Sequence, residues 1–144
     1  MAGSGELRHV YTTFIRTTPE RLWRAITRFE LVEKYYFGMG LKSELKAGSP
    51  IAYVRRKDGQ CAIAGEVVRV VPNKLFVHTF TFTHRRDTPS RVTYRIAKAG
   101  RGVVQLTLIH DRFAGRTKTW KSVQGGWPWI VAALKSYLET GKPL

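Results

Sequence analysis

The sequence predicts a mixed α+β fold, in which a curved antiparallel sheet of six or seven strands wraps around a long C-terminal helix. Three observations support this prediction. Alternating apolar and polar residues recur from residue 48 to residue 112, two short helical patterns follow the first strand, and a long amphipathic pattern ends the chain. A chain of 144 residues with 43% hydrophobic content can bury one sizeable core, so we expect a single domain over residues 1–144.

The N-terminal part of the chain predicts one strand followed by two short helices. Residues 9–16 alternate and are rich in β-branched and aromatic side chains, which favours a strand. Thr18 can cap a helix with its hydroxyl, and Pro19 suits the first helical position because an N–H would have no partner there. Apolar residues at helical spacing predict a second short helix over residues 29–36, ended by Gly38.

Strand-like runs separated by turn residues occupy the middle of the chain. Together they predict a five-stranded antiparallel meander over residues 48–112. The pair Asp58-Gly59 stands between the first two runs and suits the positive backbone angles of a tight type I′ hairpin. Further turns are expected at residues 71–74, 85–90 and 98–102.

One face of this meander is apolar and aromatic. We expect it to point inward, because successive side chains alternate between the two faces of a strand. The predicted inward residues of the last three strands are Phe76, His78, Phe80, Phe82 and His84, then Val92, Tyr94 and Ile96, and finally Val104, Leu106, Leu108 and His110. A sheet with one apolar face needs an apolar cover.

The predicted cover is an amphipathic helix near the C-terminus. Apolar residues recur there at steps of three or four: Trp120, Val123, Trp127, Val131, Leu134 and Leu138. Gly125, Gly126 and Pro128 interrupt this stripe and predict a kink or a restart of the helix, since proline lacks a backbone donor. The helix should end near Thr140, with Gly141 as its stop. A sheet wrapped around such a helix is the helix-grip fold.

Short motifs from about residue 8 to residue 141 carry a family resemblance. They are Thr18-Pro19-Glu20 with Trp23, Tyr35-Tyr36-Phe37-Gly38, Leu75-Phe76-Val77-His78-Thr79, Pro89-Ser90-Arg91-Val92-Thr93-Tyr94, Leu106 to His110, and Gly125-Gly126-Trp127. In this order and spacing the sequence resembles the heat shock protein 90 ATPase activator homologue family, part of the START and birch-pollen-allergen superfamily called SRPBCC. The resemblance implies a cavity between sheet and helix that different members use for lipids, hormones or polyketide intermediates. It also implies a chaperone-associated interaction module as an alternative.

Large aromatic rings and inward-facing polar groups indicate where a ligand would bind. The predicted ligand-binding residues are Trp23, Tyr36, Phe37, Tyr53, His78, Phe80, Tyr94, His110, Phe113, Trp120, Trp127 and Val131. Ligand cavities combine apolar walls with a few polar groups, and the rings outnumber those that a thin sheet-and-helix core needs. We therefore expect a hydrophobic small molecule, with an acidic end because the chain is strongly basic. The alternative, in which each ring simply belongs to the core, stays open.

Catalysis and metal binding have less support than ligand binding. His78 and His110, with Tyr94, suit the proton carriers of a polyketide cyclase-like enzyme, but a buried imidazole is more often a hydrogen-bonded core group. The histidines lack the short spacing of metal ligands, and Cys61 has no identifiable base. We therefore predict no catalytic residue, no metal site and no cofactor, and we expect a binding protein rather than an enzyme.

The chain is strongly basic, with 25 Lys and Arg residues against 10 Asp and Glu residues and a formal net charge of +15. The basic residues expected to form one surface patch are Arg55, Arg56, Lys57, Arg85, Arg86, Arg91, Arg95, Lys98 and Arg101. Such a charge favours acidic partners. No nucleic-acid-binding motif accompanies it, so nucleic acid is a weaker alternative than an acidic protein partner or a solvated surface.

The expected location is the cytoplasm. No stretch approaches the roughly 18 consecutive apolar residues of a membrane span, and the first residues have no apolar signal-peptide core. The lone cysteine, Cys61, cannot form an internal disulfide, so nothing in the sequence requires an oxidising compartment. The sequence leaves the oligomeric state open, as a monomer or a homodimer.

Overall fold

The computed structural model describes residues 7–85 and 87–144; Arg86, which the sequence analysis places in the basic patch, lies outside the described residues. Strands and helices follow one another along the described chain in this order: β1 His9–Arg16, α1 Pro19–Thr27, α2 Phe29–Val32, β2 Met39–Ser43, β3 Pro50–Arg55, β4 Cys61–Val71, β5 Leu75–Phe82, β6 Ser90–Gly100, β7 Val103–Asp111 and α3 Lys118–Thr140.

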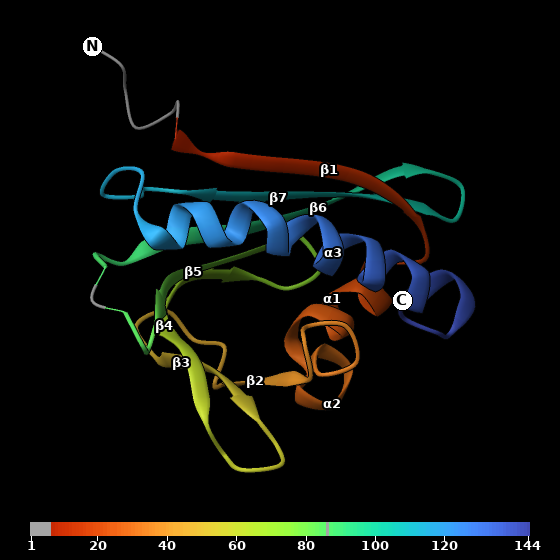
Figure 1. The fold of residues 1–144 in the computed structure, drawn as a ribbon. Helices are drawn as coiled ribbons and strands as arrows, with labels where there is room; N and C mark the ends of the chain where they lie inside the picture. The colour runs from red at the N-terminus through yellow and green to blue at the C-terminus, as the bar shows by residue number, and fades with distance from the viewer. Residues whose placement is uncertain (1–6, 86) are drawn as a thin grey trace.

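The strands form one antiparallel sheet in the order β1-β7-β6-β5-β4-β3-β2. Strands β3 to β7 are neighbours in sequence order, which confirms the predicted five-stranded meander, and β1 and β2 extend it at its two ends. The sheet curves around α3, and α1 and α2 lie beside the C-terminal half of that helix (Figure 1). The predicted α+β helix-grip fold is therefore confirmed.

Local signals explain the start of α1 but not the length of α2. The Thr18 hydroxyl accepts a hydrogen bond from the Arg21 amide, and Pro19 begins α1, as predicted. The predicted helix over residues 29–36 is too long, because α2 ends at Val32. The Lys34 and Tyr35 amides bond to the carbonyls three residues before them, and this tightens the chain out of α-helical geometry.

The β3–β4 hairpin differs from the predicted type I′ turn. Its loop is closed by a backbone hydrogen bond of 3.0 Å from the Arg55 amide to the Gln60 carbonyl. Of the central pair, only Gly59 has a positive φ, of 68°, whereas a type I′ turn requires two such residues. The predicted turn type is therefore wrong, although a hairpin does form at this position.

Strand β2 lies at one edge of the sheet, and a glycine in it lets helix α2 approach closely. A Cβ atom added to Gly40 would lie 2.5 Å from the Phe29 ring of α2. Any larger residue would therefore push α2 away from the strand. The glycine is required for this helix-to-strand packing.

Helix α3 has well-defined ends. The Thr117 hydroxyl accepts a hydrogen bond from the Trp120 amide at its start, and Gly141 stops it with a φ of 84°. Glycine adopts this left-handed conformation without the steric cost that a Cβ would bring. Within the described ranges, no helix is both long and apolar enough to cross a membrane.

Of the kink or restart predicted in the middle of α3, the restart is wrong, because the helix continues through Gly125, Gly126 and Pro128. The kink stays a prediction. Pro128 cannot donate to the carbonyl of Gln124, four residues before it. The hydroxyl of Tyr11 on β1 lies 3.4 Å from that carbonyl and donates to it. A side chain of the sheet thus bonds to a carbonyl that the proline leaves without its helical partner.

The buried side of α3 differs from the predicted stripe at two positions, because Trp120 and Val131 are only half-buried. Its buried residues are Thr119, Val123, Trp127, Ile130, Ala133, Leu134 and Leu138. Val131 is only half-buried, and Ile130 takes the inward position. In an uninterrupted helix, steps of four, three and four residues from Val123 keep side chains on one face, because each turn has about 3.6 residues.

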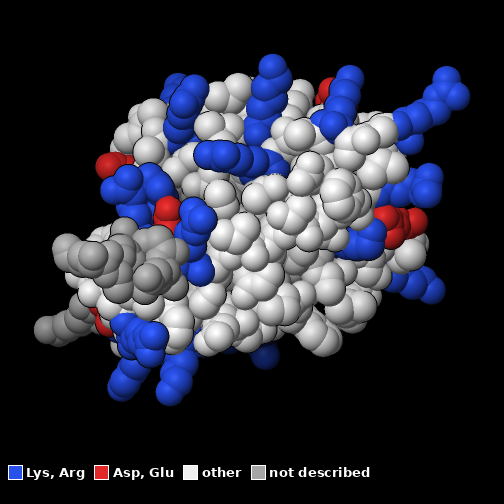
Figure 2. Space-filling view, turned by 90° about the horizontal axis from the view of Figure 1, so that it is seen from above, with Lys and Arg blue, Asp and Glu red and all other residues white. Residues whose placement is uncertain are grey.

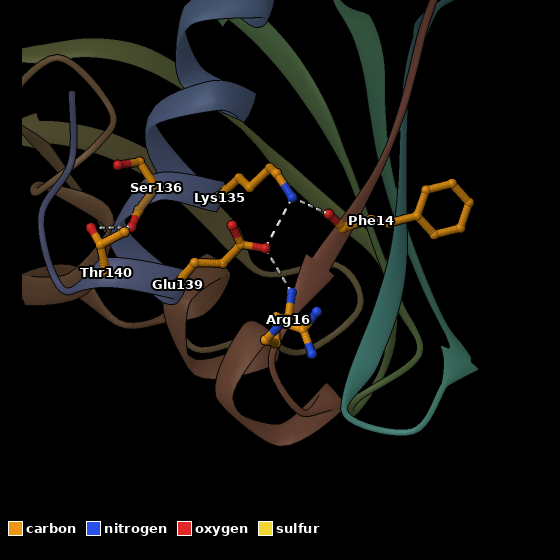
Figure 3. Close-up of polar contacts among 6 residues, drawn as sticks. All are labelled: Phe14, Arg16, Lys135, Ser136, Glu139 and Thr140. Carbon is orange, nitrogen blue, oxygen red and sulfur yellow. Dashed lines mark hydrogen bonds and ion pairs between the residues drawn. The ribbon is translucent and has the colours of Figure 1, made fainter.

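Side chains from the end of α3 close the outer edge of β1 (Figure 3). Lys135 donates to the Phe14 carbonyl and to the Glu139 carboxylate, and that carboxylate accepts the Arg16 amide at 2.9 Å. These backbone groups would otherwise be available to pair with another strand. The Phe14 ring points away from the helix, and it is 52% exposed.

The inner face of the sheet agrees with the prediction except at one strand end. The predicted inward residues of β6 and β7 are buried, as are Phe76, His78 and Phe80 of β5. Phe82 is half-buried and ends the strand, so His84 lies exposed in the following turn, contrary to the prediction. The turn begins there because the Arg85 amide bonds back to the Phe82 carbonyl.

The basic residues do not form one patch. The β3–β4 tip with Arg55 and Arg56 is separated from β6 by two strands, β4 and β5 (Figure 1). Arg56 pairs with Glu33 at 2.7 Å, and Arg91 of β6 pairs with Asp111 at 2.9 Å. On the face seen from above, Lys and Arg side chains lie along the upper, left and right margins and one lies across the upper centre, while the lower centre is uncharged (Figure 2).

Candidate functional site

A cavity of about 210 Å³ lies between the middle of α3 and the inner face of the sheet. Three parts of the chain line it: the segment that leads from α2 into β2, the strands β4 and β5, and residues 122–130 of α3. The lining residues are Tyr36, Phe37, Met39, Ile63, Phe80, Phe82, Ser122, Val123, Gly126, Trp127 and Ile130. The cavity therefore lies where the helix-grip fold brings its helix over the sheet.

The walls of the cavity are almost entirely apolar. Ser122 is the lining residue with an aliphatic hydroxyl, and it is exposed at the surface of α3. Phe37 is also exposed, at 57%, so these two residues mark where the cavity reaches the surface. Phe37 adopts a positive φ of 51°, a strained conformation for a residue with a Cβ atom.

Gly126 keeps one side of the cavity open. A Cβ atom added there would meet only the Phe37 ring, at 3.9 Å, whereas one added to Gly125 would meet nothing within 4 Å. Gly125 is exposed and does not line the cavity. Of the two adjacent glycines, only Gly126 therefore controls the space available to a guest.

The structure divides the predicted ligand-binding residues into two groups. Tyr36, Phe37, Phe80 and Trp127 line the cavity. The other eight predicted residues do not line it: Trp23, Tyr53, His78, Tyr94, His110, Phe113, Trp120 and Val131. Most residues of this second group support the cavity wall from behind or pack elsewhere in the core. The structure therefore does not bring all the predicted ligand-binding residues to one cavity.

Trp127 is held in the cavity wall by a buried hydrogen-bond chain. Its indole Nε1 donates to His110 Nδ1 at 2.9 Å, and His110 Nε2 lies 2.6 Å from the Ser90 hydroxyl. Because Nδ1 accepts, the neutral imidazole carries its proton on Nε2 and donates to Ser90. The Ser90 hydroxyl then donates to the Phe80 carbonyl at 3.3 Å. Each polar group in this chain has a partner.

The pKa of His110 is consistent with this structural role. Burial lowers it well below its usual range, and positive charge on His78 or His9 would lower it further. The imidazole is therefore neutral at pH 7. A protonated His110 would direct an N–H at the N–H of Trp127 and break the chain.

A second buried cluster lies behind Tyr36. The Tyr36 ring stacks on Tyr53 with centroids 4.5 Å apart, and the Tyr53 hydroxyl lies 3.3 Å from His78 Nε2. His78 Nδ1 is 2.6 Å from the Thr79 carbonyl, so Nδ1 carries the proton and Nε2 accepts from Tyr53. Burial lowers the pKa of His78 to about 4 and raises the pKa of Tyr53 and Tyr94 above their usual range.

The remaining rings pack in two other places. Trp23 of α1 meets Phe76 edge-on, with centroids 6.1 Å apart. At the start of α3, Trp120 stacks on His9 at 5.5 Å, and Phe113 meets the same imidazole at 5.6 Å. These contacts belong to the core rather than to the cavity.

Several lining residues were not among the predicted ligand-binding residues. Met39 lies on the short strand β2, between glycines that resemble a turn signal in the sequence. The prediction named Val131 in place of Ile130. An uninterrupted helical repeat that starts from Val123 and Trp127 predicts Ile130. Ile63 has no such local signal, because its place on the wall depends on the pairing of β4 with β5.

The predicted proton carriers lie away from the cavity wall. His78, His110 and Tyr94 do not line the cavity, and their pKa shifts keep each of them neutral at pH 7. Among residues 7–85 and 87–144, no group of three or more His, Cys, Asp or Glu side chains is placed to hold a metal ion. A cavity with such largely apolar walls can enclose a hydrophobic molecule.

Solved structures of other proteins share this fold. Protein MLL2253 from Mesorhizobium loti is 24% identical, with a TM-score of 0.77 over 91% of this chain and 96% of that one. PFC0360w, described as an HSP90 activator from Plasmodium falciparum, is 19% identical, with a TM-score of 0.70 over 83% and 86%. DynU16, described as encoded in the dynemicin biosynthetic locus, is 23% identical, with a TM-score of 0.76 over 94% of this chain and 48% of that one.

Identities this low show a common fold and nothing finer. A sequence comparison with curated proteins gave no match. The family model for Activator of Hsp90 ATPase homolog 1-like protein matches residues 16–139, which is most of the chain. The resemblance inferred from the sequence motifs is thereby confirmed: this chain belongs to the Activator of Hsp90 ATPase homolog 1-like protein family.

Proposed function

We propose that this protein binds a hydrophobic small molecule in the cavity between α3 and the sheet. The observation that carries the proposal is the cavity itself, about 210 Å³ in volume and walled by aromatic and aliphatic side chains. Dry apolar cavities of about 150 Å³ are known to hold benzene. A guest the size of two fused rings therefore fits the space.

The supporting shell favours a preformed site. Trp127 and Tyr36 are each anchored from behind, by His110 and by Tyr53 respectively, so the wall needs little rearrangement when a guest enters. Binding sites of this kind lose less affinity to ordering of side chains. Similarity to DynU16, from a biosynthetic locus, supports a small natural product as the class of guest.

The adjacent glycines of α3 provide a matched test. Gly126→Leu places a side chain in the cavity, whereas Gly125→Leu makes the same change on the exposed side of the helix. Both variants replace glycine by a better helix former. The probe is 2-naphthalenemethanol, a neutral two-ring molecule, and its binding is measured by isothermal titration calorimetry and by the shift in unfolding temperature.

The wild-type protein and Gly125→Leu are expected to bind the probe and to gain thermal stability from it, because a guest that binds only the folded state stabilises that state. Gly126→Leu is expected to lose binding while it remains folded. Equal binding by Gly126→Leu and Gly125→Leu would place the guest outside the cavity. Absence of binding to the wild-type protein would count against this class of guest.

A chaperone-associated role is the second candidate, and it is favoured by the family match and by the similarity to an HSP90 activator. The uncharged lower centre and the basic margins of the face in Figure 2 offer a surface for an acidic protein partner. A pull-down with purified Hsp90, with and without 500 mM salt, tests this role. Stable capture by a Gly126→Leu variant would show that the chaperone interaction does not need the cavity.

A further inference from the structure

Two exposed aromatic side chains stand at the mouth of the cavity. Phe37 lines the cavity and is 57% exposed, and Trp129 of α3 is 50% exposed. Trp129 follows Gly126 by three residues and Ser122 by seven, and these spacings keep side chains on one side of a helix. Within the described ranges, Phe14 is the remaining Phe or Trp side chain that is at least half exposed. The exposed rings are therefore concentrated where the cavity opens.

The exposed side of α3 is uncharged around Trp129 and basic at its start. Its exposed residues from 122 to 132 carry no charge, and they are Ser122, Gln124, Gly125, Pro128, Trp129 and Ala132. Lys118 and Lys121 are exposed in the first turns of the helix, and Lys118 precedes Trp129 by eleven residues, which is about three turns. The first acidic residue of α3 is Glu139, near its end. The exposed rings thus share a helix face with two lysines.

Acidic residues beside this surface have partners of their own. Asp87, whose charge also acts on Lys118, accepts hydrogen bonds from the Thr119 hydroxyl and amide at 2.6 and 3.2 Å. Glu33, in the segment that leads to Phe37, pairs with Arg56 at 2.7 Å. Since the whole chain carries a net charge of +15, the surroundings of the rings favour an anionic partner.

A phospholipid bilayer with anionic head groups matches this combination of features. Tryptophan favours the interface between head groups and acyl chains, because its ring is apolar and its N–H is polar. Lysines next to the rings are attracted by the negative charge of the head groups. The small residues Gly125 and Ala132 beside Trp129 leave its ring raised above the helix surface, which suits shallow insertion into an interface.

We propose that the mouth of the cavity docks on an anionic lipid bilayer, with Trp129 and Phe37 in the interfacial layer and Lys118 and Lys121 against the head groups. The docking goes beyond the proposed function, because it does not require an occupied cavity. Its consequence for the guest rests on that function: the mouth faces the acyl chains, where a hydrophobic molecule dissolves better than in water. The guest then passes between bilayer and cavity without crossing the aqueous phase.

The test measures cosedimentation with vesicles of phosphatidylcholine and phosphatidylserine, and with vesicles of phosphatidylcholine alone. Trp129→Ala removes one of the two rings. Phe14→Ala is the matched control, because Phe14 is 52% exposed and its ring points away from α3 (Figure 3). Quenching of tryptophan fluorescence by lipids with brominated acyl chains shows whether Trp129 enters the bilayer.

A second comparison tests the basic residues. The double variant Lys118→Gln with Lys121→Gln removes two charges beside the rings. The double variant Lys98→Gln with Arg101→Gln removes two exposed charges at the β6–β7 hairpin, which lies against the start of α1 and away from the cavity lining. Both double variants lower the net charge by the same amount, so a difference between them reports position rather than total charge.

The wild-type protein and Phe14→Ala are expected to bind the vesicles that contain phosphatidylserine, with quenching by the brominated lipids. Trp129→Ala should bind about five- to tenfold more weakly, because a half-exposed ring has about half of its burial still to gain, and its quenching should be largely lost. The Lys118 and Lys121 double variant should bind about ten- to thirtyfold more weakly, at about fivefold for each lysine near the head groups. The Lys98 and Arg101 double variant should lose less.

The inference is overturned if the wild-type protein does not bind the anionic vesicles, or if it binds them without quenching. Equal losses in Trp129→Ala and Phe14→Ala, or in the two double variants, would also overturn it, because general attraction to a basic protein would then explain the binding. Self-association of the wild-type protein that Trp129→Ala abolishes would assign the rings to a second copy of the chain instead.

Titration with 2-naphthalenemethanol separates this inference from the proposed function. Trp129 does not line the cavity, so Trp129→Ala should bind this probe as the wild-type protein does. If the wild-type protein binds the probe but not the vesicles, the docking is refuted and the cavity proposal stands. If it binds the vesicles but not the probe, the docking stands and this class of guest is refuted.

Discussion

Acidification from pH 7 to pH 4.5 is expected to destabilise this protein through its buried histidines. His78 is 1% exposed, and burial lowers its pKa from 6.5 to about 4, although the bond to the Thr79 carbonyl acts in the opposite direction. In the unfolded chain the imidazole is hydrated and binds its proton near pH 6.5. Between these two pKa values the unfolded state binds more protons, so the free energy of unfolding falls as the pH falls.

The size of the effect follows from the pKa difference. One pKa unit corresponds to about 1.4 kcal/mol, and integration from pH 7 to pH 4.5 gives a loss of about 2 kcal/mol from His78 alone. His110 adds a loss of the same sign, because its pKa also lies well below 6.5 in the folded state. Carboxyl groups with lowered pKa, such as Glu33 and Glu139, lose their stabilising effect mainly below pH 4.5, so this window isolates the histidines.

Urea denaturation at constant ionic strength, followed by tryptophan fluorescence at pH 7, 5.5 and 4.5, measures the effect. His78→Gln removes the titrating group, so its loss of stability over this range should be smaller by about 2 kcal/mol. His84→Gln is the matched control, because it removes an exposed imidazole from the turn after β5. It should leave the pH dependence of the wild-type protein unchanged.

The reasoning would be refuted by a free energy of unfolding that is equal at pH 7 and pH 4.5 in the wild-type protein. It would also be refuted if His84→Gln flattened the profile and His78→Gln did not. The first result would mean that the folded and unfolded states take up the same number of protons in this range, so that burial does not lower the pKa of these histidines. The second would assign the effect to the protein surface.

Other substitutions probe the hydrogen bonds and the helix that support the cavity. Trp127→Phe should lower the free energy of unfolding by about 1–3 kcal/mol, because His110 Nδ1 then stays buried without a donor; unchanged stability in urea would contradict the assigned hydrogen bond. Gly125→Ala should raise it by up to about 1 kcal/mol, since the added Cβ meets no atom within 4 Å; a lower melting temperature would show strain. Thr117→Ala should lower it by about 1 kcal/mol through loss of the cap on the Trp120 amide, and a thermal melt checks this.

Local chemistry made the architecture predictable. The cap at Thr18, the proline at the start of α1 and the glycine at the end of α3 act within a few residues, so the sequence shows them directly. Alternation likewise identified the inward faces of β6 and β7. The errors lie where a boundary depends on packing: α2 ends at Val32 because the chain must turn into β2, a strand set by contacts that local spacing does not reveal.

The site was only partly predictable for a related reason. Trp127 and Phe80 were found because they follow the period of their own elements. His78 and His110 have the same inward orientation, yet other rings separate them from the cavity, and alternation does not distinguish the first layer of a core from the second.

The cavity has an energetic consequence that favours occupation by a guest. In a dry interior, lost packing costs about 24 cal/mol per Å³, so about 210 Å³ corresponds to at most about 5 kcal/mol, an upper limit because the cavity reaches the surface at Phe37. Alanine at position 126 would fill part of this space with an ordinary contact to Phe37 and would suit the helix better by about 1 kcal/mol. Stability alone therefore favours a larger residue at Gly126. A bound guest would make the packing contacts that the glycine does not make. The leucine side chain of Gly126→Leu would make them instead, so this variant should stabilise the empty protein and abolish its response to ligand.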